Sequence, residues 1–168
     1  MCLRVTTNTR PTTLVAVLLN PPLTTSGVRT ILAVDRASAV LGYESVRVVN
    51  LFAEATPTVA ELNARITRPC SRARPNLRQA LKDADGLLGA WGVSGLTGQA
   101  REAKQRQLRW FFQQATAADF SHIWMVGGEP RHPSRWHQYL SDKYRRTGGG
   151  SFTARLEEAL SSVPIGSI

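Results

Sequence analysis

The sequence has little sulfur and no long hydrophobic run. Its two cysteines, Cys2 and Cys70, show no metal-ligand spacing, so we expect neither a zinc site nor a disulfide. No stretch approaches the roughly 18 apolar residues that a membrane-spanning helix needs. Residues 1–12 lack the apolar segment of a secretory signal. We therefore expect a cytoplasmic protein without a membrane partner.

Acidic residues are also scarce, with 12 Asp and Glu against 21 Lys and Arg, which gives a net charge of +9. This excess favours a polyanionic partner, with nucleic acid first. The cations form two clusters: Arg65, Arg68, Arg72, Arg74, Arg78 and Lys82 run without an acid among them, and Arg131, Arg135, Lys143, Arg145 and Arg146 follow later. Two such clusters are typical of phosphate contacts. A merely solvated basic face is the alternative.

The remaining composition, 42% hydrophobic and 20% charged, is that of a soluble globular protein. At 168 residues the chain is long enough to form a hydrophobic core that needs no disulfide or metal ion to stabilise it. We expect a single domain over residues 1–168, with residues 1–12 a flexible or loosely packed N-terminus. We also expect a monomer that needs no cofactor and no obligate protein partner.

Four short apolar runs, at residues 14–19, 46–49, 87–91 and 123–126, are typical of strands buried on both faces. Helical patterns lie between and after them, at residues 28–41, 58–65, 75–84 and 99–117, and around residues 139–144 and 151–160. This alternation predicts an α/β fold, a three-layer αβα arrangement with a central four-stranded parallel sheet.

Each predicted strand ends in residues that can bind or react: Asn20, Asn50, Trp91 and Gly127. Open α/β sheets build ligand sites at the carboxyl ends of their strands. The richest stretch is Ile123–His137, where a buried strand breaks at two glycines and continues as a loop that Pro130 and Pro133 stiffen. That loop holds Glu129, Arg131, His132, Ser134, Arg135 and His137. A basic surface loop that happens to contain histidines is the alternative.

The segments L-L-N-P (18–21), V-V-N-L-F-A-E-A-T-P (48–57), A-W-G (90–92) and P-R-H-P (130–133) resemble a small bacterial and phage family of uncharacterised, antiphage DNA glycosylase-like domains. The wider resemblance is to the uracil-DNA glycosylase superfamily, whose members carry N-P or D-P after strand one, Asn after strand two and a His-Pro-Ser loop after the last strand. The resemblance covers most of the chain and implies a fold like that of uracil-DNA glycosylase.

The resemblance also implies residue roles. Asn20 would position a water, Asn50 would read a pyrimidine edge with its amide, and His132 would face the departing base. The chain departs from the superfamily at Arg135, where a Pro or another small residue usually follows the His-Pro-Ser loop. It also has Asn rather than Asp at position 20, which argues against efficient removal of uracil.

Cleavage of an N-glycosidic bond places positive charge on the sugar and negative charge on the base. His132 can stabilise the negative charge on the base. Glu129 or Glu54 could supplement water activation, and we rank Glu129 above Glu54. Phe52 or Trp91 could stack on a flipped base. The substrate pocket is further expected to include Pro21, Thr25 and Ser26, and the DNA contacts to include Arg131, Ser134, Arg135, Arg72, Arg74 and Lys143. We expect Arg101, Lys104, Arg106 and Arg109 to form a solvated helix face.

These features favour a monofunctional DNA glycosylase, because no Lys lies in the motifs to form a Schiff base. The best candidate substrate, led by the resemblance, is a modified pyrimidine such as glucosylated 5-hydroxymethylcytosine in phage DNA, excised in antiviral defence to leave an abasic site. Three alternatives stay open: a uracil or thymine mismatch repair glycosylase, an N-glycosidase or base-transferase acting on free nucleosides or nucleotides, and a non-catalytic reader of modified DNA. For each amide or His the competing interpretation is a turn-stabilising side chain, and for each aromatic it is a core residue.

Overall fold

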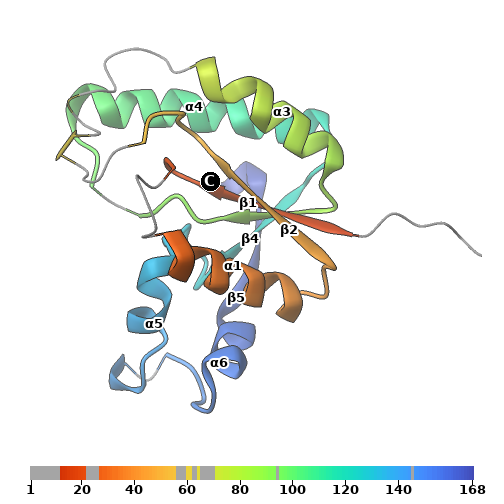
Figure 1. Ribbon diagram of the computed structural model, residues 1–168, viewed down its shortest axis with the longest axis vertical. Helices are drawn as coiled ribbons and strands as arrows, with labels where there is room; N and C mark the ends of the chain where they lie inside the picture. The colour runs from red at the N-terminus through yellow and green to blue at the C-terminus, as the bar shows by residue number, and fades with distance from the viewer. Residues whose placement is uncertain are drawn as a thin grey trace, which may run out of the picture.

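The computed structural model describes residues 12–21, 27–55, 60, 61, 64, 71–93, 95–144 and 146–168 (Figure 1). The described strands form one sheet in the order β2-β1-β3-β4-β5. Four of them run parallel: β1 (Thr13–Leu18), β2 (Ser45–Asn50), β3 (Gly86–Gly89) and β4 (His122–Val126). These four coincide with the four predicted apolar runs. An α/β fold with a mostly parallel sheet is therefore confirmed.

The prediction of a four-stranded sheet is wrong, because a fifth strand, β5 (Leu160–Pro164), pairs antiparallel with β4. Its sequence, Leu-Ser-Ser-Val-Pro, is half polar, and its residues alternate between more and less buried. Such a half-exposed strand lacks the continuous apolar run that revealed the others. Pro164 is tolerated because β5 lies at the edge of the sheet.

Helices cover both faces of the sheet (Figure 1). On one face α3 (Arg74–Asp83) and α4 (Gly98–Ala117) pack over Val15 and Val17 of β1. On the other face α1 (Val28–Val40), α5 (Trp136–Tyr139) and α6 (Phe152–Ala159) pack over Leu14 and Ala16. Successive residues of β1 thus enter opposite cores, which is why its apolar run is continuous. The short 3-10 turns are η2 (Ser71–Ala73), η3 (Pro133–Arg135), η4 (Asp142–Tyr144) and η5 (Ile165–Ser167).

Local sequence signals explain where these helices begin and end. Gly42 follows α1 with φ +79°, a conformation that favours glycine and ends the helix. Pro75 lies in the first turn of α3, as its sequence position predicted. The predicted helix at residues 58–65 lies mostly outside the described residues. No helix in the described ranges is long and apolar enough to span a bilayer.

The strand order defines where a ligand can bind. β1 has β2 on one side and β3 on the other, so the winding of the chain reverses between β1 and β3. In open α/β sheets this reversal opens a crevice outside the carboxyl ends of the strands. The predicted motifs around Asn20, Asn50, Trp91 and His132 all follow parallel strands at this carboxyl edge of the sheet.

Candidate active site at the carboxyl edge of the sheet

Backbone hydrogen bonds hold the loops of the carboxyl edge side by side. The Phe52 N–H donates to the Leu19 carbonyl at 2.9 Å, which joins the chain after β2 to the chain after β1. The Gly92 N–H donates to the Pro130 carbonyl at 2.6 Å, which joins the loop after β3 to the loop after β4. The four motifs therefore lie along one rim in the order of their strands, and these bonds join them in two neighbouring pairs.

The hydrogen bonds of His132 favour one tautomer of its ring. Its Nδ1 lies 2.8 Å from the Ser134 hydroxyl and accepts from the Ser134 backbone N–H at 3.3 Å. Because a backbone N–H can only donate, Nδ1 carries no proton and the neutral ring carries it on Nε2. Burial lowers the pKa of His132, and the nearby Arg135 lowers it further. The result is a neutral imidazole with an Nε2–H donor.

The His132 loop folds toward the end of β3. A Cβ placed on Gly92 would lie 3.9 Å from the Cβ of His132. Neighbouring strands are about 4.8 Å apart, so the ends of β2 and β3, with β1 between them, are separated by about 10 Å. The Asn50 end of β2 and the loop after β3 therefore lie two strand spacings apart, with the end of β1 between them.

Asn50 is the last residue of β2, opposite Leu18 of β1. Its Oδ1 is buried and has no hydrogen-bond partner within the described part of the chain. Buried polar atoms are paired in nine cases or more out of ten, so an exception calls for an explanation. An acceptor reserved for the N–H of a ligand is one.

Asn20 is half-buried, and its Nδ2 donates to the neighbouring Pro21 carbonyl at 3.3 Å. This bond is of the local kind that the turn-stabilising interpretation expects. The amide lies after β1, between the positions of Asn50 and Gly92 along the rim. Thr25 and Ser26, the other predicted pocket residues of this loop, lie outside the described residues.

Glu129 and Arg131 form an ion pair with each other. The Arg131 guanidinium also stacks 4.0 Å above the centre of the Tyr139 ring. The Arg131 carbonyl accepts from Trp136 Nε1 at 2.9 Å, and the Trp136 side chain is fully buried. Arg131 therefore stabilises the loop through contacts within the protein. Glu129 was predicted to act on substrate and Arg131 on phosphate, and each already has a protein partner.

Two glycines turn the chain from β4 into this loop. Gly127 and Gly128 have φ values of +64° and +72°, and Val126 and Glu129 form a β-bridge across them. Two consecutive positive φ values are those of a type I′ turn. Gly127 has a second reason to be glycine, since a Cβ there would collide with the Tyr139 ring.

The predicted stacking residues, Phe52 and Trp91, lie in the core. Phe52 is 0% exposed and Trp91 is 3% exposed. The Trp91 ring packs edge-on against Phe112 at 5.8 Å between centroids. Phe52 presents no surface on which a base could stack, and the core interpretation fits it better. Trp91 borders a pocket described below.

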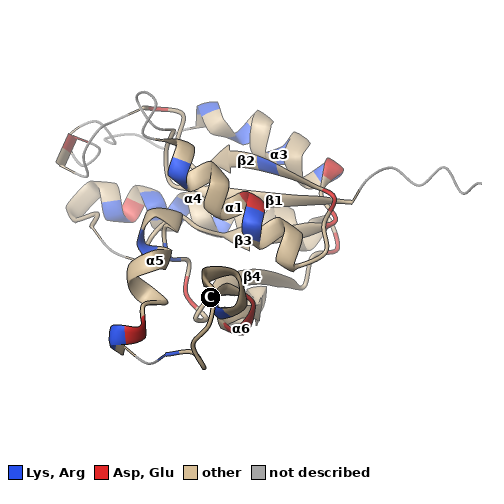
Figure 2. Ribbon diagram, turned by 60° about the horizontal axis from the view of Figure 1, so that its bottom comes forward, with Lys and Arg blue, Asp and Glu red and all other residues tan. Residues whose placement is uncertain are grey.

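The predicted DNA-contacting cations divide into two kinds. Arg72, Arg135 and Lys143 are exposed, as is Ser134. Arg74, by contrast, stacks 4.6 Å from the Trp110 ring centre and donates to Gln107 Oε1 at 3.1 Å. Gln107 is buried and in turn donates to the Leu51 carbonyl at 2.9 Å, just after β2. Arg74 thus supports the rim from below. Figure 2 shows Lys and Arg spread along α3 and α4 and near α5.

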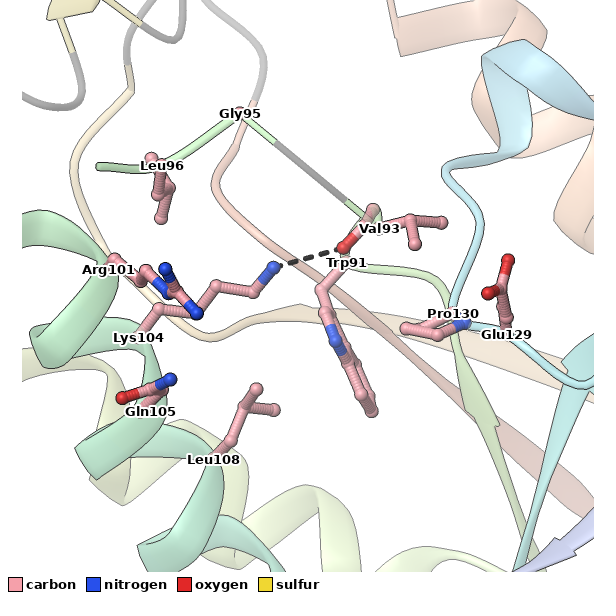
Figure 3. Close-up of a pocket in the computed structure, with 11 residues that line it drawn as sticks. Trp91, Val93, Gly95, Leu96, Arg101, Lys104, Gln105, Leu108, Glu129 and Pro130 are labelled. Atoms are coloured by element: carbon pink, nitrogen blue, oxygen red, sulfur yellow. Dashed lines mark hydrogen bonds between the residues drawn. The ribbon is translucent and has the colours of Figure 1, made fainter.

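Lys104 is a residue that the sequence-based prediction misplaced. It was expected on a solvated helix face, but it is half-buried and its Nζ donates to the Gly92 carbonyl at 3.0 Å. Burial lowers the pKa of Lys104. It lines a pocket of about 350 Å³ between α4 and the loop after β3 (Figure 3). Helical periodicity carries no signal that this loop folds over the helix.

The described residues contain no group of three or more His, Cys, Asp or Glu side chains placed to hold a metal ion. Residues 2–134 match a family model described as "Protein of unknown function (DUF1643)". This chain belongs to the DUF1643 family. The DUF1643 match spans all four strand-end motifs and ends at Ser134, so α5, α6 and β5 lie beyond it. Comparisons with curated proteins and with solved structures returned no match.

Proposed function

We propose that this member of the DUF1643 family is a monofunctional DNA glycosylase that flips a modified pyrimidine out of DNA, excises it and leaves an abasic site. The observation that carries the proposal is His132, a neutral imidazole whose Nδ1 is occupied by Ser134 and whose Nε2–H is a donor. A departing pyrimidine gathers negative charge on its ring oxygen, and a preorganised donor stabilises that charge.

The second support is the unpaired, buried Oδ1 of Asn50. A pyrimidine presents an N–H on its pairing edge, either the ring N3–H of uracil or the exocyclic amine of a cytosine. That N–H can donate to Oδ1, while the His132 Nε2–H donates to a base oxygen. The two groups together recognise a flipped base and favour its departure.

In this mechanism a water attacks the sugar C1′ as the bond from C1′ to the base nitrogen breaks. The base leaves with the bonding electron pair and takes up a proton, and the water loses one. Asn20 orients that water through its amide. An amide is only weakly basic, so it orients the water without deprotonating it, and the main stabilisation falls on the departing base. Together with the departures from the superfamily loop, this favours a modified pyrimidine, with glucosylated 5-hydroxymethylcytosine in phage DNA as first candidate, over uracil.

The net charge of +9 supports DNA as the substrate over a free nucleoside, because a free nucleoside would gain little from two cationic clusters. Excision of a phage-specific base would serve antiviral defence in the cytoplasm.

One observation favours a second candidate, a non-catalytic reader of modified DNA. Glu129 is engaged by Arg131, and Asn20 donates to the adjacent Pro21 carbonyl. A site in which neither group activates a water would bind a flipped base without cleaving it.

The test is to incubate the protein with phage DNA carrying glucosylated 5-hydroxymethylcytosine, with unmodified DNA and with uracil-containing DNA. Released base is followed by mass spectrometry and abasic sites by alkaline cleavage. The variants are His132→Ala and Asn50→Ala. The matched control is His122→Ala. His122 is exposed and begins β4, so it lies at the amino ends of the parallel strands, away from the candidate site.

Release from modified DNA alone, lost in His132→Ala and Asn50→Ala but kept in His122→Ala, supports the proposal with its substrate. Release from uracil DNA keeps the mechanism and discards the role in defence. Intact DNA in all three reactions, with retained binding that His132→Ala weakens, supports the reader instead.

A further inference from the structure

The pocket beside α4 is separate from the Asn50 end of the rim and has a mixed lining. Its apolar part comes from Trp91, Val93, Leu96 and Leu108, and its polar part from Arg101, Lys104, Gln105 and Glu129 (Figure 3). Its volume of about 350 Å³ is in the range of pockets that bind small molecules. The lining combines an apolar floor with a cationic wall.

The cationic wall lacks a compensating acid. Lys104 reaches across the pocket to the Gly92 carbonyl and forms no ion pair with any described carboxylate. Glu129 lies on the opposite side of the pocket from Lys104 in Figure 3 and is paired with Arg131. Arg101 lies three residues before Lys104 on α4, one helical turn away, and lines the same pocket. A half-buried cation without a counter-charge is costly, and an anionic ligand removes that cost.

The pocket is also joined to the His132 loop. The carbonyl that accepts from Lys104 belongs to Gly92, whose N–H donates to Pro130, two residues before His132. A group bound at Lys104 therefore lies next to the loop that faces the departing base.

We propose that this pocket is a nucleotide subsite, in which Lys104 and Arg101 bind a phosphate and the apolar floor formed by Trp91, Leu96 and Leu108 packs against the nucleoside. Its assignment to the nucleotide that adjoins the excised one in the DNA strand rests on the proposed glycosylase function. The subsite itself requires only a nucleotide with a free or bridging phosphate.

The subsite is tested by NMR titration of ¹⁵N-labelled protein with three probes: thymidine 5′-monophosphate, thymidine and inorganic phosphate. We expect the monophosphate to shift the Gly92 and Gly95 amides and to bind more tightly than either of the other two. Lys104→Met, which keeps the apolar stem, should weaken its binding about tenfold or more, because it removes a charge-assisted hydrogen bond to the phosphate. Arg101→Gln should weaken it less, since Arg101 is exposed.

The matched control is Lys82→Met on α3, an exposed lysine that does not line the pocket; it should bind the monophosphate like the wild type. Thermal melting of each variant verifies that it is folded. Equal binding by Lys104→Met and wild type overturns the subsite, and so does inorganic phosphate that binds as tightly as the monophosphate.

The experiments can contradict the subsite and the proposed function independently of each other. Lys104-dependent nucleotide binding without release of base from any DNA would support the subsite while removing the glycosylase. Release of base without Lys104-dependent nucleotide binding would remove the subsite alone. If both hold, Lys104→Met should raise KM for modified DNA about tenfold or more and change kcat little, because the pocket binds a part of the strand that does not react.

Discussion

Two side chains at the carboxyl edge of the sheet are costly to the folded protein. Asn50 buries an acceptor that no described donor satisfies, and Lys104 is a half-buried cation that no described acid neutralises. Sites that bind a ligand often keep such costs, because the ligand supplies the missing partner. Removing the polar atom should then stabilise the free protein while it removes function.

Asn50→Leu tests this trade directly. Replacing the amide by an apolar side chain of similar size removes the unpaired buried oxygen, whose desolvation costs about 1–3 kcal/mol. We expect a higher Tm together with the loss of base release. Asn76→Leu is the control, because Asn76 is exposed and accepts from Arg47 at 2.8 Å, so its replacement should not raise the Tm. A lower Tm for Asn50→Leu would mean that its amide contributes to the folded state.

His132 should produce a characteristic pH dependence. Burial and Arg135 hold the pKa of His132 below the ordinary value of 6.5, so near neutral pH the folded protein keeps the neutral ring. The unfolded chain binds the proton at a higher pH than the folded protein does. The stability that neutral His132 contributes is therefore complete above about pH 6.5 and is lost as the pH falls toward the lowered pKa.

We expect the titration of His132 to leave the rate of base release unchanged above pH 6.5 and to lower that rate only at lower pH. An NMR titration should give a His132 pKa below 6.5, with ring ¹⁵N shifts that place the proton on Nε2. Ser134→Ala should weaken the tautomer preference. A pKa above 6.5, or a proton on Nδ1, would remove the observation on which the glycosylase proposal depends.

At the scale of elements, β1 to β4 were predictable and β5 was not. β1 and β3 lie inside the sheet and are almost entirely buried, which requires continuous hydrophobicity, and β2, although it is an edge strand, keeps the apolar residues Val46, Val48 and Val49. β5 pairs at an edge and needs only alternate apolar residues, so Leu160-Ser161-Ser162 carries no such signal. The same limit applies to the site, because strand-end residues could be named from the sequence, whereas the approach of Lys104 to Gly92 depends on a tertiary contact.

The glycine turn after β4 should show two different costs. Gly127 and Gly128 both have positive φ, so replacing either by Ala costs about 1 kcal/mol in backbone strain. A Cβ at Gly128 meets open space, whereas one at Gly127 collides with the Tyr139 ring. Gly127→Ala should therefore be the more destabilising change in urea unfolding.

A double-mutant cycle separates the two effects. In a Tyr139→Ala background the additional cost of Gly127→Ala should fall to that of Gly128→Ala, since the collision is gone. A cost that stays the same in both backgrounds would show that Tyr139 does not constrain this turn.

At the scale of the whole molecule, the net charge of +9 does not indicate which cations would meet DNA. Arg74 supports Gln107 and stacks on Trp110, whereas Arg135 and Lys143 are exposed next to the His132 loop and in η4. Cations that touch phosphate release counterions, and each should add about one to the slope of log affinity against log salt. Cations that support the fold should leave that slope alone.

We therefore expect the double variant Arg135→Ala/Lys143→Ala to weaken DNA binding, to reduce the salt slope by about two and to leave the Tm within about 1 °C, because exposed substitutions change stability little. Arg74→Ala should instead lower the Tm and leave the salt slope unchanged. It leaves Gln107 Oε1 buried without its donor, which costs about 1–3 kcal/mol and lowers the Tm. Fluorescence anisotropy across a salt series, paired with thermal melting, measures both quantities. An unchanged salt slope in the double variant would mean that DNA binds elsewhere than beside the His132 loop, and the exposed Arg72 would be the next candidate.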